Sequence, residues 1–297
     1  MKDFLLLTSS AGASSPVFCE LYADESYRHT KGSKTLNIHE TAIVHPKAEL
    51  ADDVEVGPYS IISEDVKIGR GTKIGPHVQI DRWTTIGEDC QLFFGCTVGN
   101  PSKDLKYGGW RSYAIIGDRN VFREYVSISR ATTEESATII GNDNLFMNWV
   151  NIAHDCIIGS NVIMANLATL GGHVIIEDNC RIGAKTAYHQ FVRVGKMSMS
   201  GACSYFSQDV PPFTLSTGNP ARVRSLNLIG LRTSKVNPMR TLPPRTITLL
   251  KRAFRILFRS KLNMSQAIKK VREAIEPNEE VEYLLRFIES SKRGIGM

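Results

Sequence analysis

The chain has 297 residues, a net charge of +6 and 42% hydrophobic residues. This length accommodates one large domain and a smaller one, with enough apolar residues for a sizeable core. No apolar run approaches the roughly 20 residues that a membrane-spanning helix needs, and the run at residues 4–7 is too short for a signal peptide. These features argue against stable membrane insertion and favour the cytoplasm, where cysteine thiols stay reduced.

A six-residue period organises residues 37–222, whereas residues 1–36 show no repeat and are expected to form a loose extension. Such a period fits neither an α-helix nor a β-hairpin sheet, but it is the repeat of a parallel β-helix. The sequence therefore predicts a mainly β fold in which one apolar side chain per unit fills a triangular coil. The positions in this phase are Val56, Ile62, Ile68, Ile74, Ile80, Ile86, Leu92, Val98, Ile116, Phe122, Ile128, Ile140, Phe146, Ile152, Ile158, Met164, Leu170, Ile176, Ile182, Tyr188, Val194 and Phe206.

Two further positions of each unit support this fold. A glycine often follows the inward residue, as at Gly57 and Gly69, and it suits a corner with unusual backbone angles. The residue two before the inward one must also point inward, because side chains alternate along a strand. Four cysteines occupy this second position, and we interpret them as packing residues rather than disulfide or metal ligands. They are Cys90, Cys96, Cys156 and Cys180.

Two segments, residues 100–114 and residues 131–137, interrupt the repeat, which resumes in phase after each of them. Loops that project from a regular scaffold commonly carry binding groups. We therefore expect both segments to contribute to a binding site on the coil surface.

Residues 223–297 lack the repeat and predict a small C-terminal α-helical domain. Pro243 and Pro244 begin its first long helix, Ser265 is expected to cap a second one over residues 267–275, and a third covers residues 279–290. We expect these helices to pack together and cap the β-helix. Lys and Arg are concentrated here, so an acidic carrier protein or a nucleic acid fits as a partner, as does a plainly solvated surface.

The dipeptide His154–Asp155 follows an inward isoleucine at a corner, where side chains can reach the outside of the coil. A histidine held by a carboxylate is a general base near neutral pH, although a surface histidine would show the same dipeptide. Gly172 and His173 follow about one coil later and His189 about one coil after that, so stacking should place them in neighbouring layers. The Gly172 N–H could then stabilise an oxyanion with no side chain blocking the approach.

Other reaction types lack their motifs. The three histidines suggest zinc, but the H-x4-H pair of β-helical carbonic anhydrases is missing, and we expect neither a metal nor a cofactor. There is no serine nucleophile elbow, P-loop or dinucleotide fingerprint. Direct attack by an acceptor hydroxyl, with His154 removing its proton, needs only the groups already named.

Together these segments resemble the UDP-N-acetylglucosamine 3-O-acyltransferase family, which catalyses the first step of lipid A biosynthesis. The resemblance runs from Asn37 to the C-terminus and keeps the order and spacing of the family's motifs. Its most specific blocks are residues 104–107, 116–120, 152–156, 172–173, 189–191, 208–212 and 218–219.

The resemblance implies a left-handed parallel β-helix and a homotrimer in which His154 faces the Gly172 N–H across a subunit boundary. It implies acyl-carrier protein as the donor, a UDP-sugar as the acceptor and no nucleic acid partner. By resemblance His154 is the general base for the sugar 3-hydroxyl, Asp155 orients it and Gly172 stabilises the oxyanion. Substrate contacts are implied for Asp104, Lys106, Asn151, His173, His189, Gln190, Asn219 and Arg232.

The chain also departs from the family's pattern. Asn151 and Ser129 stand where the common enzyme has histidines, and Thr233 and Ser234 replace an arginine pair. Ala202 replaces a glycine that helps to measure acyl length, so its methyl group is expected to shorten the preferred chain. Two alternatives stay open: an acyltransferase for a 3-amino UDP-sugar that forms an amide, and a non-catalytic paralogue that binds carrier protein.

Overall fold

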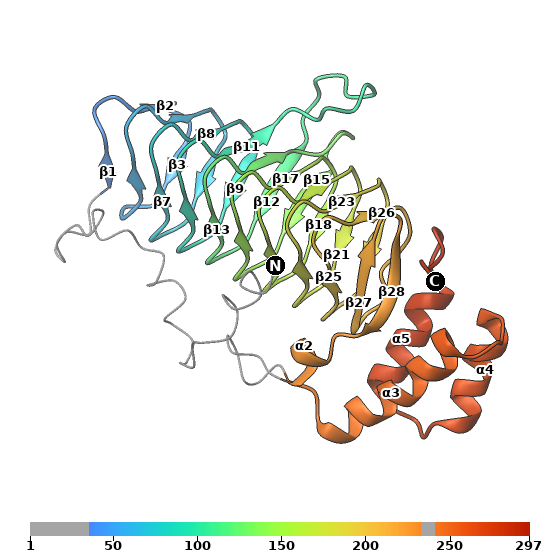
Figure 1. Ribbon diagram of the computed structural model, residues 1–297. Coiled ribbons are helices and arrows are strands. Elements are labelled where there is room, and N and C mark those ends of the chain that lie inside the picture. Colours follow the sequence, from blue (N-terminus) through green and yellow to red (C-terminus); the bar gives the residue numbers. More distant parts are fainter. Residues whose placement is uncertain (1–35, 233–240) are drawn as a thin grey trace.

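The computed structural model describes residues 36–232 and 241–297 (Figure 1). Short strands stack into a three-sided prism, and helices gather at its C-terminal end. The predicted N-terminal extension, apart from Leu36, lies outside the described residues, as do Thr233 and Ser234.

Three sheets form the faces of the prism, and each takes every third strand along the chain, except that the first sheet ends with β27 and β28 after β25. The first sheet contains β1 (Asn37–Ile38), β4 (Glu55–Val56), β7 (Lys73–Ile74), β10 (Gln91–Leu92), β13 (Val121–Phe122), β16 (Leu145–Phe146), β19 (Ile163–Met164), β22 (Arg181–Ile182), β25 (Met199–Ser200), β27 (Thr214–Gly218) and β28 (Ala221–Leu226). The second contains β2 (Ile43–Val44), β5 (Ile61–Ile62), β8 (Gln79–Ile80), β11 (Thr97–Asn100), β14 (Ser127–Ser129), β17 (Asn151–Ile152), β20 (Thr169–Leu170), β23 (Ala187–Tyr188) and β26 (Tyr205–Phe206). The third contains β3 (Glu49–Leu50), β6 (Lys67–Ile68), β9 (Thr84–Ile86), β12 (Tyr113–Ile116), β15 (Ala137–Ile140), β18 (Ile157–Ile158), β21 (Ile175–Ile176) and β24 (Arg193–Val194).

The register of these sheets follows the six-residue repeat. Glu55 pairs with Lys73, so one turn of the coil takes 18 residues. The step becomes longer in only one stretch, where Gln91 pairs with Val121 and Val121 pairs with Leu145. The extra residues form the two predicted loops, which leave the prism without disturbing the coil beneath them. Every pairing in the prism is parallel except that of β28, which turns back on β27.

The predicted inward positions form the core of the prism. Ile80, Ile128 and Ile152 have no exposed surface, and the same holds for the second inward position at Val54. The cysteines predicted to pack inside are free and buried, which confirms that they pack within the coil: Cys90, Cys96, Cys156 and Cys180. Burial raises the pKa of the Cys156 thiol to about 12, so this thiol stays protonated at neutral pH.

The glycines after the inward residues have a different role from the predicted one. A Cβ atom at Gly69 would lie 2.7 Å from the carbonyl carbon of Gly87 in the next coil, yet the Gly69 backbone is not left-handed. Left-handed angles occur instead two residues further on, at residues such as Tyr59 (φ 58°) and Asp155 (φ 60°). At Gly69 the prediction of unusual angles is therefore wrong, because close stacking of the coils excludes a side chain there.

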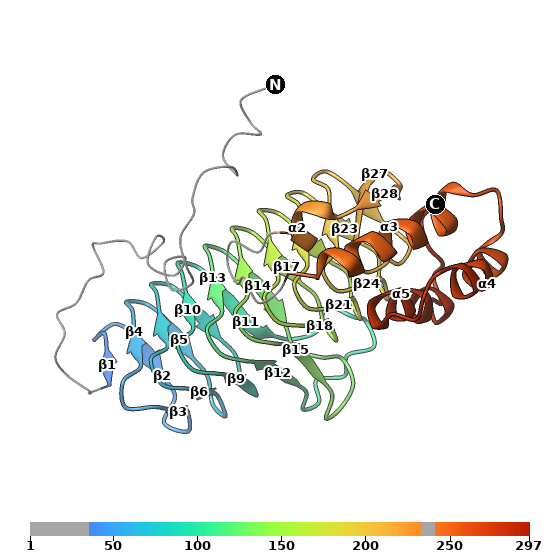
Figure 2. The same ribbon diagram turned by 90° about the horizontal axis from the view of Figure 1, so that it is seen from below.

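The helices are α2 (Leu228–Arg232), α3 (Pro244–Arg259), α4 (Met264–Ala274) and α5 (Glu279–Glu289), and they cover the C-terminal end of the prism (Figure 2). Phe213 and Val223 of the prism belong to the same apolar cluster as Leu250 and Leu284 of the helices. No helix in the described parts of the chain is long and apolar enough to cross a membrane.

Two details at this end differ from the predicted ones. Asn263 caps α4 through the Gln266 N–H, so the prediction of Ser265 as the cap is wrong: Ser265 lies inside the first turn. Strand β28 runs through residues 222 and 223, where we predict the domain boundary, and the helical part begins only at α2.

Candidate active site

Most of the predicted site residues lie on one edge of the prism, which we call the histidine edge. It is formed by the residues that follow the strands of the second sheet. Register stacks β17 on β20 and β20 on β23, so residues after these strands lie in columns. One column contains His154, Gly172 and Gln190, and the next contains Asp155, His173 and Phe191.

His154 and Asp155 form a buried hydrogen-bonded pair. His154 Nδ1 lies 2.8 Å from Asp155 Oδ2, and the two side chains are 6% and 9% exposed. An ionised carboxylate can only accept a hydrogen bond, so Nδ1 carries the hydrogen and Nε2 keeps its lone pair. The pair can therefore act as a general base through His154 Nε2.

The Asp155 carboxylate is held by donors from the second loop. The Thr132 N–H lies 3.1 Å from Oδ2, and Ser136 Oγ lies 3.4 Å from Oδ1. Burial by itself raises the pKa of Asp155, but the hydrogen bonds from His154 and Thr132 outweigh burial and hold this pKa below its ordinary value. Asp155 is thus ionised at neutral pH and fixes the orientation of the imidazole.

Gly172 lies directly against the His154 ring. A Cβ atom at Gly172 would be 2.3 Å from His154 Cε1 and 2.7 Å from Nε2, so no side chain fits. Both residues come from the same chain, which contradicts the expectation that they face each other across a subunit boundary: consecutive coils of one prism already place them together. Within the described residues the Gly172 N–H donates to no acceptor and is available to a ligand.

His173 extends this group. Its ring stacks on Phe191 with centroids 4.6 Å apart, and its Nε2 lies 3.6 Å from Asp155 Oδ2. Ligand atoms of His154, Asp155 and His173 lie within 4.8 Å of one another, close enough to surround a metal ion. Ligands about 2.0–2.2 Å from a tetrahedral zinc ion stand further apart than a hydrogen-bonded pair does. The 2.8 Å separation of His154 and Asp155 is that of a hydrogen-bonded pair; the absence of a metal stays a prediction.

The first loop brings Asp104 and Lys106 toward the same edge. Asp104 Oδ1 accepts a hydrogen bond from the Lys106 N–H at 2.9 Å, which shapes the loop. Ser102 Oγ lies 2.7 Å from Thr132 Oγ1, which in turn lies 2.9 Å from His154 Nδ1. The loop is therefore tied to the imidazole through two hydroxyl groups.

Sequence reasoning missed several residues of this site. Arg130 is buried, donates to Asp81 Oδ2 at 2.9 Å and to the Tyr107 hydroxyl at 3.0 Å, and so anchors the first loop. Trp110 Nε1 donates to the Thr132 carbonyl at 2.6 Å. Four of these residues lie in or beside the two segments that interrupt the repeat, and that interruption was the available signal.

The remaining predicted residues on this face form no hydrogen bond or ion pair with His154 or Asp155 among the described residues. Asn151 is half-buried in β17, in register with Ser127 and Thr169 of the neighbouring strands. Ser129 is buried, and its hydroxyl has no hydrogen-bond partner among the described residues. His189 and Gln190 are exposed one coil beyond Gly172.

Ala202 and Asn219 lie on a different edge, which we call the aromatic edge. It follows the strands of the first sheet and carries a ladder of exposed rings in which Tyr125 and Trp149 stack with centroids 4.2 Å apart. Ala202 follows β25 and Asn219 follows β27, while Arg232 ends α2. Within one chain, therefore, these three residues do not share an edge with His154.

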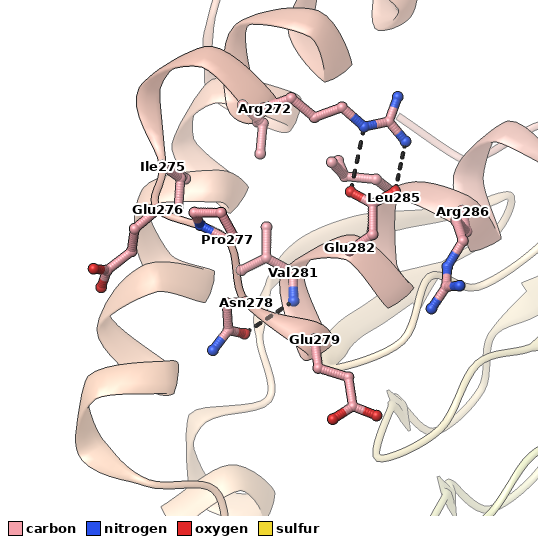
Figure 3. Close-up of a pocket in the computed structure, with 11 residues that line it drawn as sticks. Arg272, Ile275, Glu276, Pro277, Asn278, Glu279, Val281, Glu282, Leu285 and Arg286 are labelled. Atoms are coloured by element: carbon pink, nitrogen blue, oxygen red, sulfur yellow. Dashed lines mark hydrogen bonds and ion pairs between the residues drawn. The ribbon is translucent and has the colours of Figure 1, made fainter.

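A separate hollow of about 450 Å³ lies between α4 and α5 (Figure 3). Arg272 at its rim is paired with Glu282 and Glu289, each at 2.7 Å. None of the residues predicted for the active site lines this hollow. The histidine edge is thus the candidate active site.

Comparison with known proteins places this geometry in a family. Residues 209–296 match the family model described as UDP N-acetylglucosamine O-acyltransferase, domain 2, and residues 137–172 match the bacterial transferase hexapeptide model. An acyl-(acyl-carrier-protein)–UDP-N-acetylglucosamine O-acyltransferase of Syntrophobacter fumaroxidans is 48% identical over 88% of this chain and 99% of its own.

Solved structures agree. The UDP-N-acetylglucosamine acyltransferase of Bacteroides fragilis is 37% identical with a TM-score of 0.83 over 88% of this chain and all of its own. The Arabidopsis UDP-N-acetylglucosamine acyltransferase is 32% identical with a TM-score of 0.76 over the same shares. The predicted left-handed parallel β-helix with C-terminal helices is confirmed. The chain belongs to the UDP-N-acetylglucosamine O-acyltransferase family.

Proposed function

We propose that this protein transfers an acyl group, in particular a 3-hydroxyacyl group, from acyl-carrier protein to the 3-hydroxyl of UDP-N-acetylglucosamine. This reaction is the first step of lipid A biosynthesis. One observation carries the proposal: Gly172, whose N–H has no acceptor among the described residues, lies so close to the His154 ring that a Cβ atom on it would be 2.7 Å from Nε2. This chain covers 99% and 98% of the length of two relatives, and their names point to the same donor and acceptor.

The chemistry follows from the positions of these groups. His154 Nε2 removes the proton of the sugar hydroxyl as its oxygen attacks the thioester carbonyl. The negative charge that develops on the carbonyl oxygen is stabilised by the Gly172 N–H. When the carbon–sulfur bond breaks, the imidazolium returns its proton to the departing thiolate of the carrier. Asp155 stabilises the imidazolium throughout and does not itself change protonation.

The roles of the other residues complete the proposal. Asp104 and Lys106 contact the nucleotide sugar and the acyl chain from the first loop. Asn151, His173, His189, Gln190, Asn219 and Arg232 line the substrate groove, and Ala202 limits acyl length. Catalysis requires neither a metal nor a cofactor. A chelator such as EDTA should leave the rate unchanged, and loss of activity that zinc restores would contradict this part.

A homotrimer is proposed because the site is incomplete within one chain. His154 lies on the histidine edge, whereas Ala202 and Asn219 lie on the aromatic edge of the same prism. A second copy whose aromatic edge meets this histidine edge brings the two sets together. The aromatic edge is also apolar enough for such a contact, because Tyr59 and Trp149 are 59% and 55% exposed. Sedimentation or light scattering measures the stoichiometry, and a monomer with full activity contradicts it.

The remaining parts of the proposal concern the domains and the partner. We assign catalysis to the β-helix of residues 37–222 and carrier binding to the basic residues 223–297, whose helices begin at α2 and suit an acidic carrier protein. We place the protein in the cytoplasm, where thiols such as those of its buried free cysteines stay reduced.

The decisive experiment is an assay of the purified protein with a mixed pool of acyl-carrier proteins and each of two acceptors. One acceptor is UDP-N-acetylglucosamine and the other is its 3-amino analogue, and mass spectrometry identifies the product. We expect an ester on the first acceptor. An amide formed several times faster on the analogue would favour the 3-amino sugar as the acceptor. The departures from the family's pattern at Asn151 and at Ser129, whose hydroxyl has no partner among the described residues, motivate this alternative. Absence of product with every donor would favour a non-catalytic paralogue.

A further inference from the structure

A relay of hydroxyl groups joins the first loop to the imidazole of His154. Thr132 Oγ1 lies 2.7 Å from Ser102 Oγ and 2.9 Å from His154 Nδ1. The backbone N–H of Asp104 donates to Ser102 Oγ at 3.2 Å. The relay therefore runs from a residue proposed to contact the substrate, through two hydroxyls, to the proposed general base.

The hydrogens along this relay follow from the types of donor and acceptor. The Asp155 carboxylate, 2.8 Å from His154 Nδ1, requires a hydrogen on Nδ1. Thr132 Oγ1 consequently accepts a share of that hydrogen, and it shares one hydroxyl hydrogen with Ser102 Oγ. Ser102 Oγ also accepts from the Asp104 N–H, so each oxygen of the relay has a hydrogen-bond partner.

Thr132 also reaches the rest of the site through its backbone. Its N–H donates to Asp155 Oδ2 at 3.1 Å, and its carbonyl accepts from Trp110 Nε1 at 2.6 Å. The residue is 7% exposed, so these bonds are sheltered from water. A single residue of the second loop thereby contacts both members of the dyad and two residues of the first loop.

We propose that Thr132 is a positioning residue that couples the first loop to the His154–Asp155 pair. Its hydroxyl holds the imidazole in the orientation that points Nε2 at the acceptor, and Ser102 transmits the position of the loop to that hydroxyl. The inference rests on the proposed acyl transfer and assigns Thr132 to that reaction. During transfer His154 becomes an imidazolium, and loss of a hydrogen bond to a charged group lowers a rate by about 10- to 100-fold.

The test compares Thr132→Val with Thr132→Ser. Valine keeps the shape and the backbone bonds but removes the hydroxyl, whereas serine keeps the hydroxyl and removes a methyl. We expect Thr132→Val to lower kcat by about tenfold or more and to raise KM for UDP-N-acetylglucosamine, because the loop is uncoupled. Thr132→Ser should keep both constants near those of the wild type. If Thr132 only packed, the order would be reversed, since serine leaves a cavity and valine does not.

Ser102→Ala tests the relay from the other end. It should raise KM for UDP-N-acetylglucosamine. In the double variant with Thr132→Val it should add little to the effect of the valine substitution, because both substitutions remove the same link. Thr133→Val is the matched control, since the neighbouring Thr133 lies exposed in the same loop and its side chain does not belong to the relay. A wild-type protein without acyl transfer would refute the proposed function itself. If the wild type is active but Thr132→Val or Ser102→Ala keeps kinetic constants within twofold of it, the coupling alone is refuted. The coupling is also refuted if the effects of the two substitutions multiply in the double variant.

Discussion

The histidine edge repeats the same corner positions from coil to coil, and two pairs of residues occupy them in different surroundings. Near the N-terminus Glu64 and Lys47 follow β5 and β2 as His154 and Asp155 follow β17. Lys47 Nζ lies 3.5 Å from Glu64 Oε2, with the two side chains 68% and 38% exposed, whereas His154 and Asp155 are 6% and 9% exposed at 2.8 Å. The coil is equivalent in both places, so the coil alone does not create a reactive pair.

The two loops supply the difference. Residues 100–112 and 131–136 cover the edge only at the later coils, exclude water and add the Thr132 and Ser136 donors around Asp155. A solvated ion pair contributes about 0–1 kcal/mol, while a sheltered pair with directed donors holds one tautomer and one orientation. The β-helix thus repeats equivalent corner positions, and the two loops that interrupt the repeat make one of these positions suitable for catalysis.

The largest expected effect separates these two pairs directly. His154→Ala should lower kcat/KM for acyl transfer by about 10³-fold, because the general base is lost. Glu64→Ala removes the side chain at the equivalent corner position and should leave the rate within twofold. Steady-state kinetics with both substrates measures the contrast. Comparable losses in the two variants would mean that the edge acts structurally and that His154 is not the base.

The sequence predicts the repeating coil better than it predicts the loops that complete the site. The burial of Ile152 and Cys156 could be predicted, because a coil that repeats every 18 residues gives each position a fixed environment. The neighbourhood of His154 and Gly172 could be predicted for the same reason, whereas the subunit boundary that the resemblance implied between them is wrong. The contact between Thr132 and His154 could not, since the intervening loop has no period and its hydrogen bonds depend on three-dimensional packing.

The second prediction concerns the contact of neighbouring coils. Gly172→Ala should lower kcat by about 100-fold, because its Cβ atom would lie 2.3 Å from His154 Cε1 and force the imidazole aside. Gly159→Ala is the matched control: its Cβ atom would lie 2.3 Å from Asp178 Oδ1, away from the histidine edge. That variant should lose stability but keep its specific activity. Thermal unfolding and kinetics on both variants separate the effects, and full activity of Gly172→Ala would exclude the proposed contact.

The third prediction uses the pH dependence of stability. The pKa of Asp155 is lowered from 3.8 in the folded state, so its stabilising effect is present above that value and is lost as the pH falls through the folded pKa. Asp155→Asn should therefore melt a few degrees below the wild type at pH 7. The gap should close progressively below about pH 4. Asparagine tolerates the left-handed backbone at this position, so the variant removes the charge with little strain.

A control for that series is Glu64→Gln, because the exposed partner of Lys47 should show almost no gap at any pH. A gap for Asp155→Asn that widens in acid would contradict the lowered pKa. A gap for Glu64→Gln as large as that for Asp155→Asn would remove the contrast between the two pairs.

The smallest expected effect lies on the aromatic edge. If Ala202 limits acyl length, Ala202→Gly removes one methyl group and should shift the preference toward longer donors by about fourfold, the equivalent of one buried methylene. Competition between acyl-carrier proteins of different chain length, read as product ratios by mass spectrometry, measures the shift. Ala184 follows β22 as Ala202 follows β25, so Ala184→Gly is the matched control one coil earlier. Equal shifts in both variants would indicate general loosening of this edge. A shift at Ala202 alone would show that a residue remote from His154 in its own chain measures the acyl length. That result requires the aromatic edge of one subunit to meet the histidine edge of another.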